Sequence, residues 1–363
     1  MKFPKIRMIH KWISLAFLSV WILQAASGLM IAFRADIDDF LLGQAAAPTD
    51  SAAIAQTIER MVADGDDISS IWISGGRNGQ YDLYLDRDGE SRTVRIDGAG
   101  NLVRDRSDAN LFSEGAIFET VTQFHKTLML GALGYTFLTL SGLLLLSNIT
   151  LGLVLGWPMR KRLSAFTKAP NAPKAATLSG WHWRVGFWGA LPAAVVVLSG
   201  TMLAQADVIA DWLGVKEETP SITQATDAPA APLEQIIETA LSEYPGSTLA
   251  ALSLPSETRP WYRVRVNAPA EMPRLYGATR VYIGLDGAVL LDHDAGNSQT
   301  NERISEALYP LHTGQIGGLP GRLVNFATGI WLLVMVTLGL QLWLSRNQQR
   351  QRQQPQPAKG DDK

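Results

Sequence analysis

The chain contains no cysteine among its 363 residues, and charged residues make up only 18% of it. The lack of cysteine excludes disulfide bonds, thiolate zinc sites, iron–sulfur clusters and covalent haem attachment through a Cys-x-x-Cys-His motif. The charged fraction is below the roughly 25% that is typical of soluble domains. A net charge of −2 gives no reason to expect binding to nucleic acid.

Four apolar runs are long enough to cross a bilayer, which takes roughly 20 residues of helix. They cover residues Ile13–Phe33, Thr127–Trp157, Val185–Ala206 and Leu323–Ser345. The first run follows a basic N-terminus, as in a signal peptide, but its apolar stretch is too long for one and it has an internal counterpart later in the chain. The runs therefore predict an α-helical membrane protein with four transmembrane helices.

Basic residues indicate which ends of these runs face the cytoplasm. They are concentrated in the N-terminus, in the loop 158–180 and directly after the fourth run. We therefore expect both termini to be cytoplasmic and the two long connections between runs to be external. The Gln- and Pro-rich C-terminal segment is expected to be a disordered tail.

The two halves of the chain match each other at fixed spacing. An offset of 172 residues relates His10 to His182 and Gly28 to Gly200. An offset of 187 residues relates His125 to His312 and Gly142 to Gly329. The halves run in the same direction, so the sequence predicts a tandem parallel repeat with a pseudo-two-fold axis along the membrane normal.

Each external connection has the pattern of an α+β domain. Helical apolar spacing covers Ala53–Ala63 and Leu233–Glu243. Alternating runs that predict strands cover Ile71–Ile73, Tyr81–Leu85, Val94–Ile96, Tyr262–Val266 and Arg280–Ile283. Neither connection contains a nucleophile–base pair, a glycine-rich phosphate loop or a metal-ligand cluster, so no catalytic residue is identified.

Four of the five histidines stand one at the head of each apolar run: His10, His125, His182 and His312. Because successive runs alternate in direction, the first and third of these histidines are expected near the cytoplasmic face. The second and fourth are expected near the external face. Neutral imidazole is a common ligand of haem iron, and ionisable groups at membrane depth are usually functional. The pattern predicts two haem b groups, ligated by His10 with His182 and by His125 with His312. The alternative is that the histidines are headgroup anchors.

Small and basic residues fit the same interpretation. Glycines that would let a flat porphyrin approach a helix are Gly28, Gly142, Gly200 and Gly329, although packing between helices explains them equally well. Counted along straight helices, Gly28 and Gly200 are expected at the depth of the external histidine pair, and Gly142 and Gly329 at the depth of the cytoplasmic pair. Basic residues that could pair with haem propionates are Lys11, Arg184, Lys126 and Arg322, although interfacial anchors would look the same.

The head motifs carry a resemblance to a known family. They are His-Lys-Trp at residues 10–12 and His-Trp-Arg at residues 182–184, accompanied by Phe-Arg-Ala-Asp at residues 33–36 and by the Ser-Gly pairs. With them the chain resembles the PepSY-associated transmembrane family of bacterial inner-membrane proteins, which includes ferrisiderophore reductases of the ferrioxamine type. The second head motif departs from the first, because Trp183 precedes Arg184.

The resemblance implies a bacterial inner-membrane location and gives the expected organisation. The segments are transmembrane helices at 1–34, 121–157, 181–206 and 311–345, periplasmic PepSY-like domains at 35–120 and 207–310, a basic loop at 158–180 and a tail at 346–363. It also implies a di-haem reductase that reduces an Fe(III)-siderophore on the periplasmic side and so releases the iron. The cytoplasmic loops are too short for a flavin or nicotinamide domain, so the electrons come from a separate cytoplasmic donor or from quinol.

Two other functions agree with the same features. One is a non-catalytic membrane scaffold whose PepSY-like domains bind a peptide or protein partner. The other is transmembrane electron transfer to a different periplasmic acceptor. A colourless purified protein would favour the scaffold, and titration with acceptors would separate the two electron-transfer functions.

Overall fold

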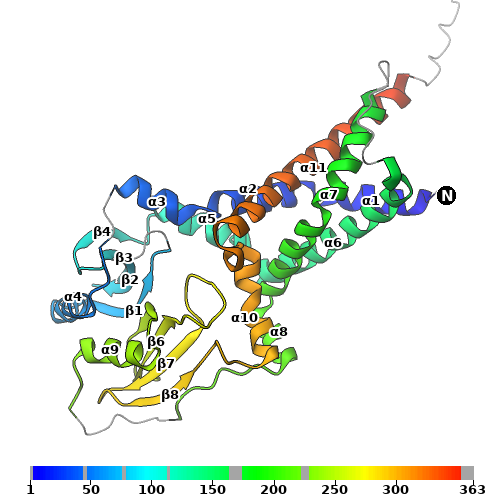
Figure 1. The fold of residues 1–363 in the computed structure, drawn as a ribbon. Helices are drawn as coiled ribbons and strands as arrows, with labels where there is room; N and C mark the ends of the chain where they lie inside the picture. The colour runs from blue at the N-terminus through cyan, green and yellow to red at the C-terminus, as the bar shows by residue number, and fades with distance from the viewer. Residues whose placement is uncertain are drawn as a thin grey trace, which may run out of the picture.

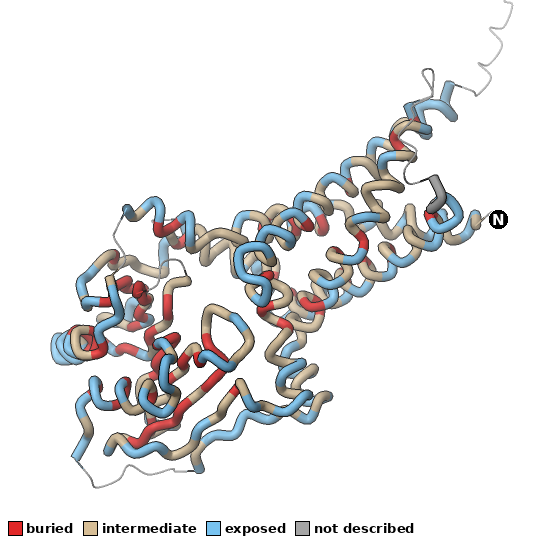
Figure 2. Tube along the Cα trace, in the orientation of Figure 1, coloured by how far each residue is buried: buried red, intermediate tan, exposed pale blue. Residues whose placement is uncertain are grey.

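The computed structural model describes residues 3–43, 47–75, 79–112, 115–162, 174–221 and 229–352, without the side chains of residues 160–162. Long helices form a bundle, and a β-sheet with its own helices lies at one end of it (Figure 1). Buried residues are concentrated in the sheet region, whereas the bundle helices carry mostly intermediate and exposed residues (Figure 2). Helices that are apolar on most of their surface, as these are, suit a lipid environment.

Five long or paired helices form the bundle within the described residues. They are α1 (Pro4–Ala16), α2 (Leu18–Ile31), α6 (Ala132–Gly156), α7 (Lys174–Leu203) and α11 (Gly318–Arg352). Three candidate membrane spans contain α6, α7 and α11, and the α1–α2 pair, bent by 60°, is a fourth if it makes one crossing. The expected apolar runs thus all fall on helices.

Two shorter helices precede α6 and α11 and correct the expected starts of the second and fourth runs. They are α5 (Ala116–Thr127), which carries His125, and α10 (Thr300–Thr313), which carries His312. Leu128 and Met129 adopt positive φ after α5, and the 3-10 helix η2 (Gln315–Gly317) follows α10. Left-handed residues cannot continue the i to i−4 hydrogen bonds of a helix. The two histidines therefore lie before the long helices and not at their first turns.

The sheet has eight strands in the order β4-β3-β2-β1-β5-β6-β7-β8, and every neighbouring pair is antiparallel. The strands are β1 (Asp67–Ile73), β2 (Gln80–Arg87), β3 (Glu90–Asp97), β4 (Leu102–Ser107), β5 (Thr248–Ser253), β6 (Trp261–Asn267), β7 (Thr279–Gly284) and β8 (Val289–His293). All five expected strands are observed. The other three were missed because β4 is polar, β8 is short, and β5 is buried on both faces and so does not alternate.

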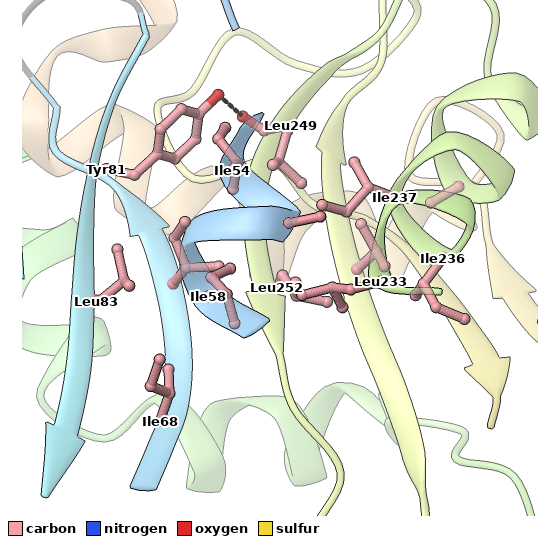
Figure 3. Close-up of a cluster of buried hydrophobic side chains, with 14 of the residues drawn as sticks. Ile54, Ile58, Ile68, Tyr81, Leu83, Leu233, Ile236, Ile237, Leu249 and Leu252 are labelled. Atoms are coloured by element: carbon pink, nitrogen blue, oxygen red, sulfur yellow. Dashed lines mark hydrogen bonds between the residues drawn. The ribbon is translucent and has the colours of Figure 1, made fainter. Parts of the chain in front are cut away.

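Helices α4 (Ser51–Ala63) and α9 (Leu233–Glu243) cover one face of this sheet, at the positions that helical spacing predicts. Ile54 and Ile58 of α4 pack with Ile236 and Ile237 of α9 in one core (Figure 3). The strands contribute alternate residues to the same core, and the hydroxyl of Tyr81 donates a hydrogen bond to a backbone carbonyl. Burial of these aliphatic side chains is the main stabilising contribution to the sheet region.

The two external connections, expected as separate domains, share this single sheet and core. Strand β1 of the first pairs with β5 of the second through Ser70–Ser253, Ile71–Leu252 and Trp72–Ala251. Residues of both connections also belong to one hydrophobic cluster. A sheet with one half removed would expose an edge strand and half of its core, which explains why the connections join.

The opposite face of the sheet carries charged side chains and meets the helices that lead to the bundle. Helix α3 (Arg34–Leu42) continues from α2 and places Asp38 2.8 Å from both Arg95 and Arg104. Arg95 also binds Asp82 at 2.8 Å. Because these groups are buried, the ion pairs fix the first half of the sheet to α3.

Two further segments complete the described chain. Helix α8 (Ala206–Leu213) follows α7, and the 3-10 helix η1 (Trp157–Arg162) follows α6. Helix α11 continues to Arg352, into the segment expected to be a disordered tail. The rest of that segment, residues 353–363, lies outside the described residues, as do residues 163–173 of the basic loop.

Candidate functional site: two histidine pairs in the bundle

The structure brings four histidines together as the two predicted pairs. The ring centres of His10 and His182 are 6.3 Å apart, and those of His125 and His312 are 6.2 Å apart. Each pair joins the first half of the chain to the second. Helices α5 and α10, which carry His125 and His312, lie at the end of the bundle next to the sheet, whereas α1, which carries His10, lies toward the other end (Figure 1).

Backbone carbonyls fix the orientation of two of these rings. Nδ1 of His10 lies 3.1 Å from the carbonyl oxygen of Asn148, and Nδ1 of His312 lies 2.9 Å from that of Val196. A carbonyl only accepts, so Nδ1 carries the proton in both rings and donates it. This tautomer leaves Nε2 with a free lone pair, which is the state that a metal-binding histidine needs.

The other two rings are held in related ways. Nδ1 of His125 lies 3.0 Å from the hydroxyl oxygen of Ser27, whose own proton goes to the carbonyl of Leu23 at 2.7 Å. The hydroxyl therefore accepts from Nδ1, and Nε2 of His125 is also free. Nδ1 of His182 is directed at the backbone of Met335, 187 residues after Asn148, without reaching hydrogen-bond geometry.

Glycines make room for each ring. A Cβ atom placed on Gly28 would lie 3.1 Å from Cε1 of His125, and one on Gly200 would lie 2.5 Å from Cε1 of His312. The sequence predicted these two glycines. At the other pair, Cβ atoms on Gly152 and Gly339 would each lie 3.4 Å from Cε1 of His10 and His182. The last two glycines were not predicted as site residues, although both recur at the offset of 187.

Gly142 and Gly329 lie elsewhere than expected. They were predicted to pack at the depth of His10 and His182, but both line a cavity beside His125 and His312. A Cβ atom on Gly142 would meet the side chain of Thr201. The difference arises because the breaks after α5 and α10 shift the depth that a straight helix from each histidine implies.

The separation of the rings suits an iron ion between them. A metal–imidazole bond is about 2.0 Å and the bound nitrogen lies about 1.1 Å from its ring centre, so two rings on opposite sides of one ion have centres about 6.2 Å apart. Among the described residues, no group of three or more His, Cys, Asp or Glu side chains could hold a metal ion. Two donors alone are too few for a structural zinc site but match a haem iron, whose porphyrin supplies the other ligands.

A cavity of about 920 Å³ lies beside the His125–His312 pair. Its wall includes both rings and all four glycines predicted from the sequence. Such a volume lies within the range of about 300–1,000 Å³ found for small-molecule and cofactor sites. On the side of the sheet the cavity reaches Arg274 and Tyr276, so it connects the bundle with the external region.

Comparison with known families agrees with this architecture. Residues 7–346 match the model of the PepSY-associated TM region, which includes both histidine pairs and the whole sheet. The chain belongs to this family. A search of the curated proteins found no match. Together with the apolar helices, membership identifies a membrane protein with a β-sheet domain.

In this PepSY-associated chain the predicted propionate partners are divided between the two ends of the bundle. Lys126 and Arg322 line the cavity, and Arg322 also forms an ion pair with Asp36. Lys11 lies over the ring of Trp12, 4.5 Å from its centre, on the same helix as His10. Arg184 follows His182 and lines a smaller cavity between α7 and α11.

Two basic residues of the cavity were missed by the sequence reasoning. Arg34 lines it and contacts Thr122 at 2.6 Å and Glu119 at 3.5 Å. Arg274 lines it from the connection between β6 and β7. The position of Arg34 at the end of the first apolar run could have indicated that it lies near the site. Arg274 had no signal, because only the folded sheet brings it to the bundle.

The fifth histidine is separate from both pairs. His293 ends strand β8, and its Nε2 lies 3.3 Å from a carboxylate oxygen of Glu306. The repeat aligns Met30 with Met202. Met30 is half exposed and does not line the cavity beside His125 and His312. Neither residue adds a ligand to the pairs.

Proposed function

We propose that this protein carries electrons across a bacterial inner membrane through two haem b groups and delivers them to a ferric siderophore on the periplasmic side. His10 and His182 would hold one haem and His125 and His312 the other. The observation that supports the proposal is the pair of ring separations, 6.3 and 6.2 Å, each suited to one iron ion between two imidazoles. The siderophore as acceptor is taken from the resemblance to ferrisiderophore reductases.

The proposal includes four transmembrane spans, with α1 and α2 as one bent span, and a tandem parallel repeat. Equivalent contacts at the two sequence offsets support it. Gly28 faces His125 as Gly200 faces His312, and Gly152 faces His10 as Gly339 faces His182. With the basic loops inside, both termini would be cytoplasmic and the sheet would lie in the periplasm.

Different residues have different roles at each histidine pair. His10 with His182 and His125 with His312 would hold the haems, and each haem, when bound, would supply an iron that gains and loses one electron. The carbonyls of Asn148 and Val196 and the hydroxyl of Ser27 hold the Nδ1 proton, so that Nε2 points away from them. The glycines keep the helix backbone close to each ring. This arrangement favours electron transfer over oxygen chemistry.

An apolar cluster lies on the bundle helices and borders the cavity of the sheet-side pair. Trp21, Leu145 and Val336 form a buried cluster on α2, α6 and α11, and Phe17 stacks on Trp21 with ring centres 6.0 Å apart. Trp21 also donates a hydrogen bond from its indole nitrogen to the hydroxyl of Ser141 at 3.1 Å.

The cavity offers a place where the acceptor could approach the sheet-side pair. Lys126 and Arg322 line the cavity and would pair with haem propionates, while Tyr276 lines the part of the cavity next to the sheet. One electron converts the chelated Fe(III) to Fe(II), which siderophores bind far less tightly, so the iron is released. The electron would come from a separate cytoplasmic donor or from quinol.

The decisive experiment is the visible spectrum of the purified, detergent-solubilised chain, oxidised and reduced, with a measured ratio of haem to protein. We expect two low-spin b haems per chain. His125→Ala and His312→Ala should each remove the same haem, and His10→Ala and His182→Ala the other. His293→Ala is the matched control, because this histidine contacts Glu306 and belongs to neither pair. A colourless protein, even after haem precursor is supplied, would reject the proposal and favour the scaffold function.

The acceptor is tested separately. Reduced protein should be reoxidised by a ferric siderophore in anaerobic stopped-flow mixing, with the reaction lost in His125→Ala. Haem that is present but not reoxidised by any ferric siderophore would reject the substrate and keep the electron-transfer function. Titration with periplasmic redox proteins would then identify the acceptor.

A further inference from the structure

Four arginines gather on the sheet face that α4 and α9 leave uncovered. Arg263 and Arg265 lie on β6, Arg280 lies on β7, and Arg274 lies between these strands. Along both strands they alternate with residues of the core, such as Val264. In all four, the Nε atom is buried and has no hydrogen-bond partner in the described part of the chain.

Carboxylates near this group are too few to neutralise it. Glu217 lies 3.5 Å from Arg263 and 3.1 Å from Arg280, and Glu306 lies 4.0 Å from Arg280. Within the described residues, Arg265 and Arg274 form no ion pair, although Arg274 donates a hydrogen bond to the backbone carbonyl of Glu306 at 3.4 Å and the carboxylates of Glu306 and Glu271 attract it. Burial lowers the pKa of Arg265 to about 10, and the charges of Arg280, Arg263 and Arg274 contribute to the shift. The face therefore has an excess of partly buried positive charge, which an anion would stabilise.

Aromatic rings connect the two unpaired arginines with the cavity. The guanidinium of Arg265 lies over the ring of Trp72 at 5.5 Å, and Trp72 meets Tyr276 edge to face at 5.7 Å. Tyr276 in turn lies 6.2 Å from Tyr309. Arg274, Tyr276 and Tyr309 all line the cavity that contains the ring of His312. Arg274 therefore lines the cavity of the sheet-side histidine pair directly, whereas Arg265 and Trp72 lie outside its wall and are connected to it through Tyr276.

We propose that Arg265 and Arg274, together with Trp72 and Tyr276, bind the acceptor, and that the acceptor is an anionic aromatic ferric chelate of the tris-catecholate type. Three catecholate dianions around Fe(III) form a trianion whose rings can stack on tryptophan, tyrosine and guanidinium groups. A tris-hydroxamate complex is neutral at the metal and has no aromatic ring to stack. This inference rests on the proposed function and names the class of its substrate, which differs from ferrioxamine.

The test measures binding alone, with gallium in place of iron. Gallium(III) forms the same chelates and is not reduced, so the measurement does not depend on haem or on electron transfer. The full chain in neutral detergent is titrated by calorimetry with gallium tris-catecholate and with gallium tris-hydroxamate. We expect the trianion to bind at least about tenfold more tightly, with an affinity that falls as salt is added.

Variants then locate the site. Arg265→Met and Arg274→Met should each weaken binding of the trianion by about tenfold, because each removes a charge-assisted contact. Arg259→Met is the matched control, since Arg259 also lies over a tryptophan, Trp261, at 5.9 Å, whereas only Trp72, under Arg265, meets Tyr276 of the cavity wall. Arg265→Lys, which keeps the charge, should retain most of the affinity and guards against a loss caused by misfolding.

Three results would overturn the assignment. They are equal affinity for the two chelates, an equal loss in Arg259→Met, and complete competition by anionic phospholipid nanodiscs, which would assign the arginines to lipid headgroups. Failure of the proposed function looks different. Tight binding of the gallium trianion by a colourless protein would keep the site and reject the haems. Reoxidation of haem by a neutral ferric chelate without binding of the trianion would keep the reductase and reject the site.

Discussion

Four glycines face a histidine ring: Gly28, Gly200, Gly152 and Gly339. Replacing them by alanine should destabilise the protein at the sheet-side pair and stabilise it at the other pair. At Gly200 the added Cβ lies 2.5 Å from Cε1 of His312, too close for a real contact. That ring is held by the carbonyl of Val196, so the helix has to move. Overpacking of this kind costs about 1–3 kcal/mol. The better helix propensity of alanine returns about 1 kcal/mol, which leaves a net loss of up to about 2 kcal/mol.

The glycines at the other pair provide the matched control. At Gly152 and Gly339 the same Cβ would lie 3.4 Å from Cε1 of the facing histidine, an ordinary van der Waals contact. Only the propensity term then remains, and alanine should stabilise the protein by up to about 1 kcal/mol. Gly28, with its contact of 3.1 Å, should fall between the two groups.

The assay is thermal unfolding of the four single Gly→Ala variants in one detergent, followed by far-UV circular dichroism. The expected order of midpoints is Gly152→Ala and Gly339→Ala highest, Gly28→Ala intermediate and Gly200→Ala lowest. The reasoning would be refuted if Gly200→Ala raised the midpoint as much as Gly152→Ala does. The unfolding midpoints are measured on the apoprotein, so the result does not depend on haem.

Three other predictions follow from specific contacts. Ser27→Ala should lower the haem affinity of the sheet-side pair by about 10–100-fold, because the Ser27 hydroxyl accepts a hydrogen bond from Nδ1 of His125. Ser199→Ala is the control and should have little effect, since the Ser199 hydroxyl binds only backbone carbonyls. Haem titration of the two variants checks this prediction. Asp38→Asn should lower the free energy of unfolding of the sheet region, measured with denaturant, by about 3–5 kcal/mol. Asp36→Asn should change it little, because Asp36 and its partner Arg322 form an exposed ion pair. Burial alone would raise the pKa of Asp38, but hydrogen bonds from Arg104 and the charge of Arg95 outweigh burial and lower the pKa. The contribution of Asp38 to the stability of the fold should therefore be complete above pH 3.8, its ordinary pKa, and should disappear as the pH falls through the lower pKa of the folded state. In the cysteine-free chain, a membrane-impermeant maleimide added to intact cells should label Glu257→Cys and leave Asn347→Cys unlabelled, and the reverse pattern would contradict the proposed orientation.

The sequence alone determined the pairing of the histidines. Because His10 and His182 head runs of one direction and His125 and His312 head runs of the other, depth follows from chain direction without any tertiary information. Alternation and helical spacing likewise located α4, α9 and five of the strands, since each pattern reports which side chains face a core. Gly28 and Gly200 were also found, because they repeat at a fixed distance from a histidine.

Only the tertiary structure decided the features that depend on breaks in helices and on contacts between distant segments. The left-handed residues after α5 and the bend between α1 and α2 leave no periodic signal, so the sequence did not predict that Gly152 faces His10. The union of the two external connections depends on β5, which is buried on both faces and does not alternate. Arg265 and Arg274 are ordinary arginines in the sequence. Their importance arises only because the folded sheet gathers positive charge, aromatic rings and the cavity wall in one place, and electrostatic interactions depend on distance in space and not on distance along the chain.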